Sequence, residues 1–260
     1  MLVDVHCHLN HELFKKDLDA VIKRSVDKGV KAIVCSGVNH PTNVEILKIA
    51  AKYDVVKCTA GLYPIDLLGL GPDESGITRQ TTPIDLDDEF EFIKKNKFVG
   101  IGECGLDYHW SKKEEEHKKQ RENFFKIISF AEKLKKPIVI HSRKAEADVI
   151  SMLESSSLKK VILHCFEGRK HLIEKAIDKG YSFSIPCNII KLQHFQAVVE
   201  RAPMQQLLTE TDSPWLGPVA VERNEPFNVL GTVQKISEIK KITAEECGNL
   251  IFMNYQRMFL

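Results

Sequence analysis

The sequence predicts an α/β protein of one domain over residues 1–260, built as an eight-stranded (β/α)8 barrel of the TIM type. Short apolar segments rich in β-branched residues alternate with longer amphipathic segments along the whole chain. This alternation favours parallel strands joined by helical crossovers, and eight such units need about 250 residues. No linker, repeat or low-complexity segment divides the sequence, so one barrel is preferred over two smaller domains.

The eight predicted strands are short apolar runs. They are LVDVHC from Leu2, VKAIVCSG from Val30, VVKCTAGL from Val55, FVGIGECG from Phe98, PIVIHS from Pro137, KVILHCF from Lys160, YSFSIP from Tyr181 and QLLTETD from Gln206. Each has the length of a strand and not of a helix. An open doubly wound sheet is the alternative. It normally has a Gly-rich turn after its first strand, and HCHLNHEL contains no glycine.

Helices are expected between and after these strands, including Leu13–Lys28, Glu114–Lys135, His171–Lys179, Asn228–Ile239 and Glu245–Met258. The last of them follows Thr-Ala-Glu-Glu, which has the pattern of a capping box. The stretch from Pro64 to Pro83 is rich in Gly, Pro and Asp, and we expect it to form a long loop over the barrel mouth.

The composition excludes a protein that binds its partners through a strongly charged surface. The formal net charge is +1, so no overall field attracts nucleic acid or membranes. No apolar stretch approaches the roughly 18 residues of a membrane span, and the N-terminal segment lacks the pattern of a secretory signal. The seven cysteines form no C-x-x-C pair, which indicates reduced thiols. We therefore expect a cytoplasmic protein with no membrane contact and no obligate protein partner.

Ligand-type residues occupy the ends of five predicted strands. Asp4, His6 and His8 alternate along the first strand and share one face, which would point into the barrel. Four further strands end at Glu103, His141, His164 and Asp212. Barrel enzymes keep their active sites at these C-terminal strand ends. Because burying so many unpaired ionisable groups would be costly, a metal cluster is the arrangement that satisfies them together.

Six motifs resemble the TatD family of metal-dependent hydrolases, which belongs to the amidohydrolase-like barrels. They are DVHCHL, IGECGLDYHW, IHSR, HCFEG, TETDSP and RNEPFN, and they follow family order over nearly the whole chain. The resemblance implies phosphodiester hydrolysis, usually of DNA, at a site with two divalent cations. It also implies the ligands: one cation on His6, His8 and Asp212, the other on His141 and His164, and Glu103 between them.

The charge of such a site favours a phosphoester substrate. Two divalent cations with Glu103 and Asp212 leave about two excess positive charges, which suits an anionic transition state. Two metals can activate a water and clamp the entering and leaving oxygens, and Asp212 is our choice for the general base. His and carboxylate ligands accept Zn, Mn, Co or Ni, and Mg where carboxylates dominate.

The remaining candidates support the ligands or contact the substrate. We expect Asp4 to orient a metal-bound histidine and Glu210 to brace Asp212, whose face it shares. Arg143 is expected to bind phosphate at the mouth. Tyr63 stands where family members usually carry His, and we expect it to donate a neutral hydrogen bond to the substrate.

Other residues at the predicted mouth concern the choice of substrate. Glu167 replaces a Ser that is usual in the family and adds a negative charge, which bears most on long nucleic acid. Phe166, Trp215 and Tyr108 lie beside predicted ligands and could stack on bases, although packing under the rim is an equally good interpretation. Glu225 is expected to anchor the loop after the eighth strand.

The sequence therefore predicts a metal-dependent nuclease that attacks DNA ends or short single strands, because a barrel mouth cannot admit a double helix. An amide or ester hydrolase of the amidohydrolase type is the alternative on the same ligands. Many such enzymes bridge their metals with a modified Lys at the end of strand four, where this chain has Glu103. A non-catalytic metal-binding or nucleotide-binding protein is the third interpretation, and it would not require Asp212 as a base.

Overall fold

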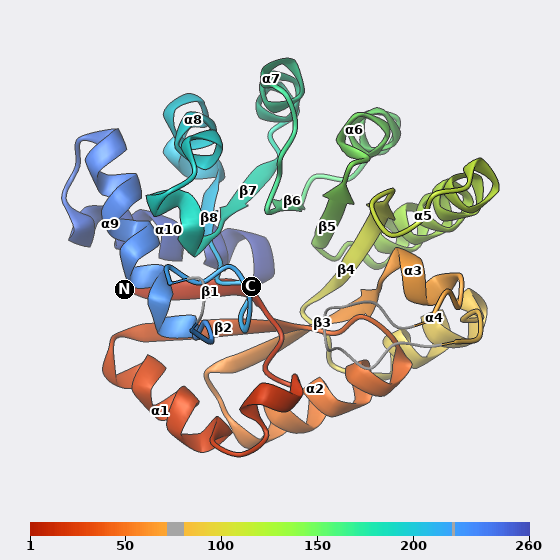
Figure 1. Ribbon diagram of the computed structural model, residues 1–260, viewed down its shortest axis with the longest axis horizontal. Coiled ribbons are helices and arrows are strands. Elements are labelled where there is room, and N and C mark those ends of the chain that lie inside the picture. Colours follow the sequence, from red (N-terminus) through yellow and green to blue (C-terminus); the bar gives the residue numbers. More distant parts are fainter. Residues whose placement is uncertain (72–80, 220–221) are drawn as a thin grey trace.

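The computed structural model describes residues 1–71, 81–219 and 222–260. It confirms the predicted barrel: eight strands form one sheet in chain order, and every neighbouring pair is parallel (Figure 1). The strands are β1 (Leu2–Cys7), β2 (Val30–Ser36), β3 (Val56–Leu62), β4 (Gly100–Asp107), β5 (Ile138–Arg143), β6 (Val161–His164), β7 (Ser182–Ile185) and β8 (Leu207–Thr209).

Helices surround the strands, because each crossover must bury an apolar stripe against the outside of the barrel. They are α1 (Leu18–Asp27), α2 (His40–Lys52), α3 (Pro64–Leu67), α4 (Leu86–Lys95), α5 (Glu114–Leu134), α6 (Glu146–Glu154), α7 (Lys170–Asp178), α8 (Gln193–Arg201), α9 (Val229–Lys240) and α10 (Ala244–Phe259). Four short 3-10 helices add η1 (Glu12–Phe14), η2 (Cys187–Ile190), η3 (Met204–Gln206) and η4 (Pro226–Asn228).

Two of the expected segments differ from the structure. The single helix expected over Leu13–Lys28 is divided into η1 and α1, because the carbonyl of Leu13 accepts a hydrogen bond from Arg223 (2.6 Å) while the Asp17 amide bonds to Phe14 (3.1 Å). The irregular stretch from Pro64 begins with α3. Its residues 72–80 lie outside the described part of the chain, and the overhang expected of them does too.

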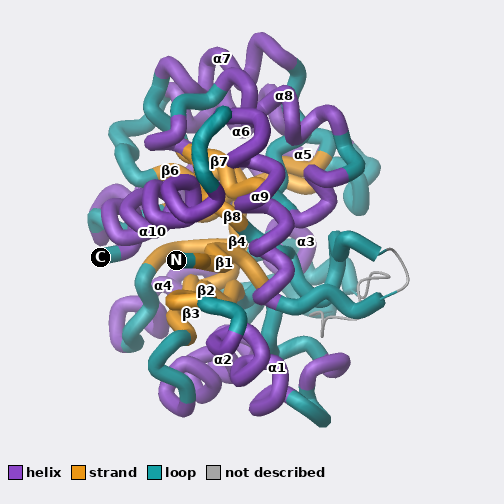
Figure 2. The backbone as a smooth tube through the Cα atoms, turned by 90° about the vertical axis from the view of Figure 1, so that its left-hand side faces the viewer, coloured by secondary structure: helices purple, strands orange, loops and turns teal. Residues whose placement is uncertain are grey.

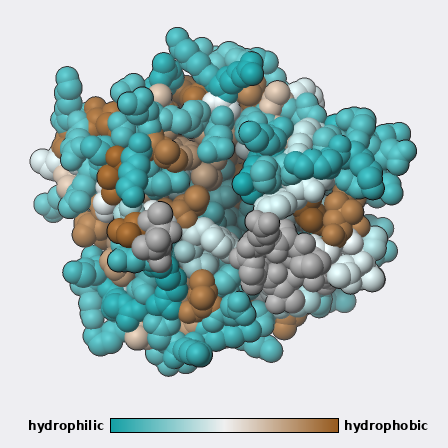
Figure 3. All heavy atoms as spheres, in the orientation of Figure 1, coloured by the Kyte–Doolittle hydropathy of each residue, from teal (hydrophilic) through white to brown (hydrophobic). Residues whose placement is uncertain are grey.

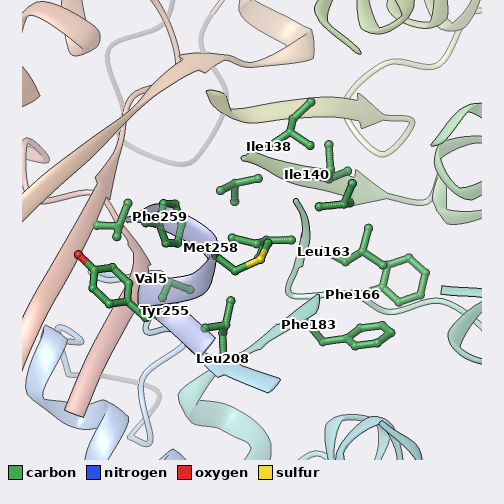
Figure 4. Close-up of a cluster of buried hydrophobic side chains, with 14 of the residues drawn as sticks. Val5, Ile138, Ile140, Leu163, Phe166, Phe183, Leu208, Tyr255, Met258 and Phe259 are labelled. Carbon is green, nitrogen blue, oxygen red and sulfur yellow. The ribbon is translucent and has the colours of Figure 1, made fainter. Parts of the chain in front are cut away.

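The hydrophobic core lies between the strands and the helices that cover them. Figure 4 shows Leu163, Phe166 and Phe183 packed together, and Val5 near Tyr255 of α10. Helix α10 runs back across β1 and β8, at the barrel end opposite α3 (Figure 2). In the described part of the chain no helix is long and apolar enough to cross a membrane.

The barrel closes between β1 and the segment after β8. The Asp212 amide donates to the His6 carbonyl at 2.9 Å, and the His8 amide donates to the Ser213 carbonyl at 2.8 Å. Strand β8 itself ends at Thr209, and Asp212 has a positive φ of 52°. The closing hydrogen bonds therefore set Asp212 directly beside His6 and His8.

Candidate metal centre

Six ligand-type side chains meet at the C-terminal ends of the strands. This end of the barrel faces the viewer in Figures 1 and 3. The side chains come from or follow β1, β4, β5, β6 and β8, and are His6, His8, Glu103, His141, His164 and Asp212. Three groups among them have potential ligand atoms within 4.8 Å of one another: His6, His164 and Asp212; His6, His8 and Glu103; Glu103, His141 and His164. The space-filling view is hollowed near the centre of this face.

Glu103 lies between two pairs of imidazoles. Its Oε2 atom is 3.6 Å from His6 Nε2 and 3.5 Å from His8 Nε2. Its Oε1 atom is 2.7 Å from His141 Nδ1 and 3.9 Å from His164 Nε2. Each carboxylate oxygen thus faces a different pair of histidines. Asp212 adds its Oδ1 atom to the first pair, at 3.5 Å from His6 Nε2 and 3.4 Å from His8 Nε2.

The ring nitrogen of each histidine that does not face Glu103 has a fixed partner. Two of these partners come from Ser36: its hydroxyl contacts His6 Nδ1 at 3.1 Å, and its carbonyl contacts His8 Nδ1 at 3.0 Å. Asp107 contacts His141 Nε2 at 2.9 Å. Contacts of this kind hold a metal-binding imidazole in one orientation and one tautomer.

Neither Ser36 nor Asp107 was assigned a role from the sequence. Both stand last in their strands, β2 and β4, as the candidate ligand His164 does in β6. Asp107 also belongs to the motif IGECGLDYHW, four residues after Glu103 and so on the same strand face. The signal was therefore present, but it is shared with any polar residue at a strand end.

Asp4 and Glu210, which we expected to support the ligand candidates, contact different atoms from those expected. Glu210 does not brace Asp212; it contacts His164 Nδ1 at 3.0 Å and the Cys165 amide at 3.0 Å. The expectation used strand alternation, which fails here because β8 ends before Glu210. Asp4 accepts from the backbone amides of His6 (3.2 Å) and Thr211 (3.0 Å). It orients backbone beside the ligands and not an imidazole, and burial raises its pKa to about 8.

Ionisation of the central residues follows from their mutual contacts. Burial raises the pKa of Glu103, but hydrogen bonds from His141 and His6 outweigh it and hold the pKa well below its usual range. Burial likewise opposes the charge of Asp212, yet His6 and His8 lower its pKa overall. Burial lowers the pKa of His141, and the carboxylates of Asp107 and Glu103 raise it to about 9. Both central carboxylates are therefore ionised near neutral pH.

Tyr63 is engaged with the same group of residues. Its ring is only 4% exposed and lies edge-on to His141, with centroids 5.1 Å apart. Its hydroxyl donates to Asp107 Oδ2 at 2.7 Å, the oxygen that also contacts His141. Burial raises the pKa of Asp107, but hydrogen bonds from His141, Trp110 and Tyr63 lower it to about 2. The substrate contact expected of Tyr63 stays a prediction.

Two glycines on β4 allow its close approach to β5. A Cβ on Gly102 would lie 2.6 Å from the Val139 carbonyl oxygen, and one on Gly105 would lie 2.1 Å from that of His141. Their φ angles are 140° and 137°, which side chains disfavour. Glu103, between these glycines, is therefore held beside His141 by tight backbone packing.

The outer candidates lie around this centre. The Arg143 guanidinium is 5.5 Å from the Trp110 ring centroid, and no carboxylate in the described part of the chain pairs with it. Glu225 bonds to Arg24 and Arg223, which supports the expected anchoring role. Trp215 packs its indole 5.3 Å from the His8 ring, between centroids.

The donor set fits a metal centre. His6 Nε2 is buried, has no hydrogen-bond partner and faces two carboxylates just beyond hydrogen-bonding distance. An unpaired buried nitrogen is costly, and a cation between the nitrogen and the carboxylates would remove that cost. Imidazole nitrogens with carboxylate oxygens are common ligands of divalent transition metals.

A parallel (β/α)8 barrel with histidines and carboxylates gathered at its C-terminal strand ends defines a metal-dependent hydrolase. The chain belongs to the TatD family: the profile of the TatD related DNases matches residues 3–260. Membership confirms the resemblance seen in the motifs and agrees with a hydrolytic enzyme of the DNase type.

Relatives are similar over almost their full length. Deoxyribonuclease TATDN3 of Homo sapiens is 33% identical over 264 residues, covering 99% of this chain and 94% of the human protein. The uncharacterized metal-dependent hydrolase YabD of Bacillus subtilis is 33% identical over 265 residues, covering 100% and 99%.

Solved structures show the same fold. The TatD homolog YJJV from Escherichia coli matches with a TM-score of 0.85 and 22% identity, covering 99% of this chain and 97% of that one. A TatD family hydrolase from Entamoeba histolytica matches with a TM-score of 0.84 and 21% identity, covering 100% and 98%.

Proposed function

We propose that this protein hydrolyses phosphodiester bonds and that its substrate is DNA, presented as a chain end or a short single strand. The division of Glu103 between two pairs of histidines is the observation that carries the proposal. It supports two cation positions that share one carboxylate, in a chain that belongs to a family of DNases.

Each of the six side chains has a role in this proposal. His6, His8 and Asp212 would hold one divalent cation, His141 and His164 would hold the other, and Glu103 would serve both. Such a pair of cations, when bound, supplies Lewis-acid charge and lowers the pKa of water. The donor set suits Zn, Mn, Co or Ni, and is less typical of Mg because imidazoles outnumber carboxylates.

Asp212 is the proposed general base. Its side chain is 16% exposed, against 7% for Glu103, so it is the central carboxylate that an incoming water can reach more easily. Its backbone is fixed by the hydrogen bond to His6, and its lowered pKa keeps it deprotonated near neutral pH, the form that a general base requires. Glu103, the more enclosed carboxylate, keeps its charge and holds both sides of the site together.

Two carboxylates behind the histidines reduce the excess positive charge that the sequence predicts for the site. Asp107 and Glu210 stand behind His141 and His164, so four carboxylates would balance the charge of two divalent cations. These two carboxylates lie on the far side of imidazoles, away from the shared centre. Attraction of an anion at the mouth therefore depends on its outer residues, where Arg143 is the candidate for a phosphate oxygen.

The low exposure of the central side chains favours substrates that are flexible enough to enter the barrel mouth. The six central side chains are at most 16% exposed, so a scissile phosphate must enter the mouth to meet them. A frayed end or a single strand can enter such a recess, whereas the interior of a rigid duplex is too wide. This supports the proposed action on ends and short single strands.

A hydrolysis panel with metals added back tests the proposed function. Protein freed of metal with a chelator is assayed on bis(p-nitrophenyl) phosphate, single-stranded oligonucleotides and a set of amides, with Zn, Mn, Co, Ni or Mg. We expect phosphodiester cleavage that requires metal. Cleavage of amides alone would favour the amidohydrolase alternative. Metal binding without any turnover would favour a non-catalytic binding protein.

A further inference from the structure

A second cavity of about 410 Å³ adjoins the metal centre. Asn188, Lys191 and Leu192 line one side, from η2 and the start of α8. Pro214 and Trp215 line the other side, in the segment that follows Asp212. The Trp215 amide donates to the Asp212 carbonyl at 2.9 Å, and its indole lies against the His8 ring. The cavity and the metal centre therefore share a wall.

The lining combines an aromatic plane with apolar side chains. Leu192, one of the apolar lining residues, is 41% exposed. Figure 3 shows apolar side chains gathered on this half of the face, over α8 and α9. One lysine, Lys191, and one carboxylate, Glu222, also line the cavity, so its charges balance. A balanced, partly aromatic cavity suits a flat neutral group better than a second phosphate.

Asn188 supplies a polar group with no protein partner. Its Oδ1 atom is buried and accepts no hydrogen bond in the structure. A buried acceptor without a donor is costly, and a ligand that brings an N–H removes this cost. Amide side chains pair with bases that carry an amino group beside a ring acceptor, as adenine does.

We infer that this cavity binds the nucleobase attached to the scissile phosphate, with the base stacked on Trp215 and an N–H of its edge on Asn188. Every DNA base carries at least one N–H that the Asn188 oxygen can accept, in thymine the ring N3–H, so the subsite requires a base without selecting among the four. This inference rests on the proposed function, because it requires a nucleotide whose phosphate lies at the metal centre.

Kinetics on matched esters test the base subsite. The p-nitrophenyl esters of dAMP, dCMP and dTMP are compared with methyl p-nitrophenyl phosphate, which has neither a base nor a second aromatic ring. The readout is kcat/KM for each nucleotide ester divided by kcat/KM for this baseless ester. In the wild-type protein we expect all three ratios to be about tenfold or more, the effect of stacking and one hydrogen bond.

Variants assign the effect of the base to named side chains. Asn188→Leu should lower all three ratios by about three- to tenfold, whereas Ile190→Ala, a change on the same 3-10 helix outside the cavity lining, should preserve them. Trp215→Leu should lower all three ratios by about tenfold through lost stacking. Equal losses on the baseless ester would instead place the effect of Trp215 on His8. Ratios near one in the wild-type protein overturn the inference, and no turnover of any of the four esters overturns the proposed function itself.

Fluorescence gives a readout that does not depend on turnover. The chain has two tryptophans, Trp110 and Trp215, so Trp110→Phe leaves Trp215 as the reporter. Addition of dAMP should quench its emission, whereas deoxyribose 5-phosphate should not. Equal responses to the two ligands would contradict stacking of a base in the cavity.

Discussion

At the scale of single residues, the geometry around Glu103 explains how the two proposed cation positions could share one side chain. Each histidine of the centre uses one nitrogen on a fixed partner and turns the other toward Glu103 or Asp212. The lone pairs are thus oriented before any metal arrives, which reduces the reorganisation that binding requires.

Glu103→Ala and Asp212→Asn should distinguish a residue that binds the metal from one that acts in catalysis. Because Glu103 faces both pairs of histidines, its removal should cost both cations. Asp212→Asn keeps an oxygen ligand but removes the proposed base, so it should keep most metal and lose turnover by several orders of magnitude. Metal content by elemental analysis and kcat on a phosphodiester check both variants. A metal-free Asp212→Asn beside a fully loaded Glu103→Ala would reverse the two roles.

Proton release should accompany metal binding. The pKa of His141 is raised to about 9 in the protein without metal, because the carboxylates of Asp107 and Glu103 outweigh burial. At pH 7 its imidazole therefore carries a proton that must leave before it can bind a cation. Affinity for the cation held by His141 should rise with pH and level off above about 9. Calorimetry in buffers of different ionisation enthalpy measures the release; binding without it would contradict the assignment.

Tyr63→Phe distinguishes a supporting hydroxyl from one that contacts substrate. The hydroxyl donates to buried Asp107, so its loss should lower the free energy of unfolding by about 1–3 kcal/mol, as expected of a hydrogen bond to a charged group. Urea denaturation measures this change. If the hydroxyl also contacts the substrate, kcat/KM should fall in addition by about three- to thirtyfold, whereas a purely supporting hydroxyl should leave it near the wild-type value.

At the scale of elements, the pattern of apolar residues predicts the strands well, but it predicts poorly which side chains contact the metal-ligand candidates. All eight strands lie within or beside the predicted runs, because buried β-branched segments are a local signal. Local signals do not report tertiary contacts. Arg223, which is distant in sequence, interrupts the first expected helix by donating to the Leu13 carbonyl. Glu210 contacts His164 because strand β8, and with it the alternation of side chains, ends before residue 210. The ligand candidates were identifiable because they are ionisable residues at or near the C-terminal ends of five apolar runs.

Gly105→Ala tests the close packing of β4 on β5. The added Cβ would lie 2.1 Å from the His141 carbonyl oxygen at a φ of 137°, so the free energy of unfolding should fall by about 3 kcal/mol or more. Gly180→Ala is the matched control, since its φ is 76° but nothing lies within 4 Å of the new atom. It should cost only about 1–2 kcal/mol. Equal losses in urea denaturation would show that strain, and not crowding beside His141, limits the substitution.

At the scale of the whole molecule, a net charge of +1 argues that affinity for nucleic acid arises in the mouth and not over the surface. Binding of a single-stranded oligonucleotide should therefore depend weakly on salt, with a slope equivalent to about one to three phosphate contacts. Fluorescence anisotropy at several salt concentrations measures the slope. A steep slope, or efficient cutting of closed circular duplex, would indicate a different binding surface.

The closure of the barrel has a consequence for the time at which activity first exists. His6 and His8 are translated well before Asp212 and Ser213, which bond to them. A nascent chain thus carries histidines without the carboxylate proposed to complete their cation site and to accept the proton. Under the proposed function, hydrolysis begins only when β1 meets the segment after β8, so a copy truncated before Asp212 should not cleave nucleic acid.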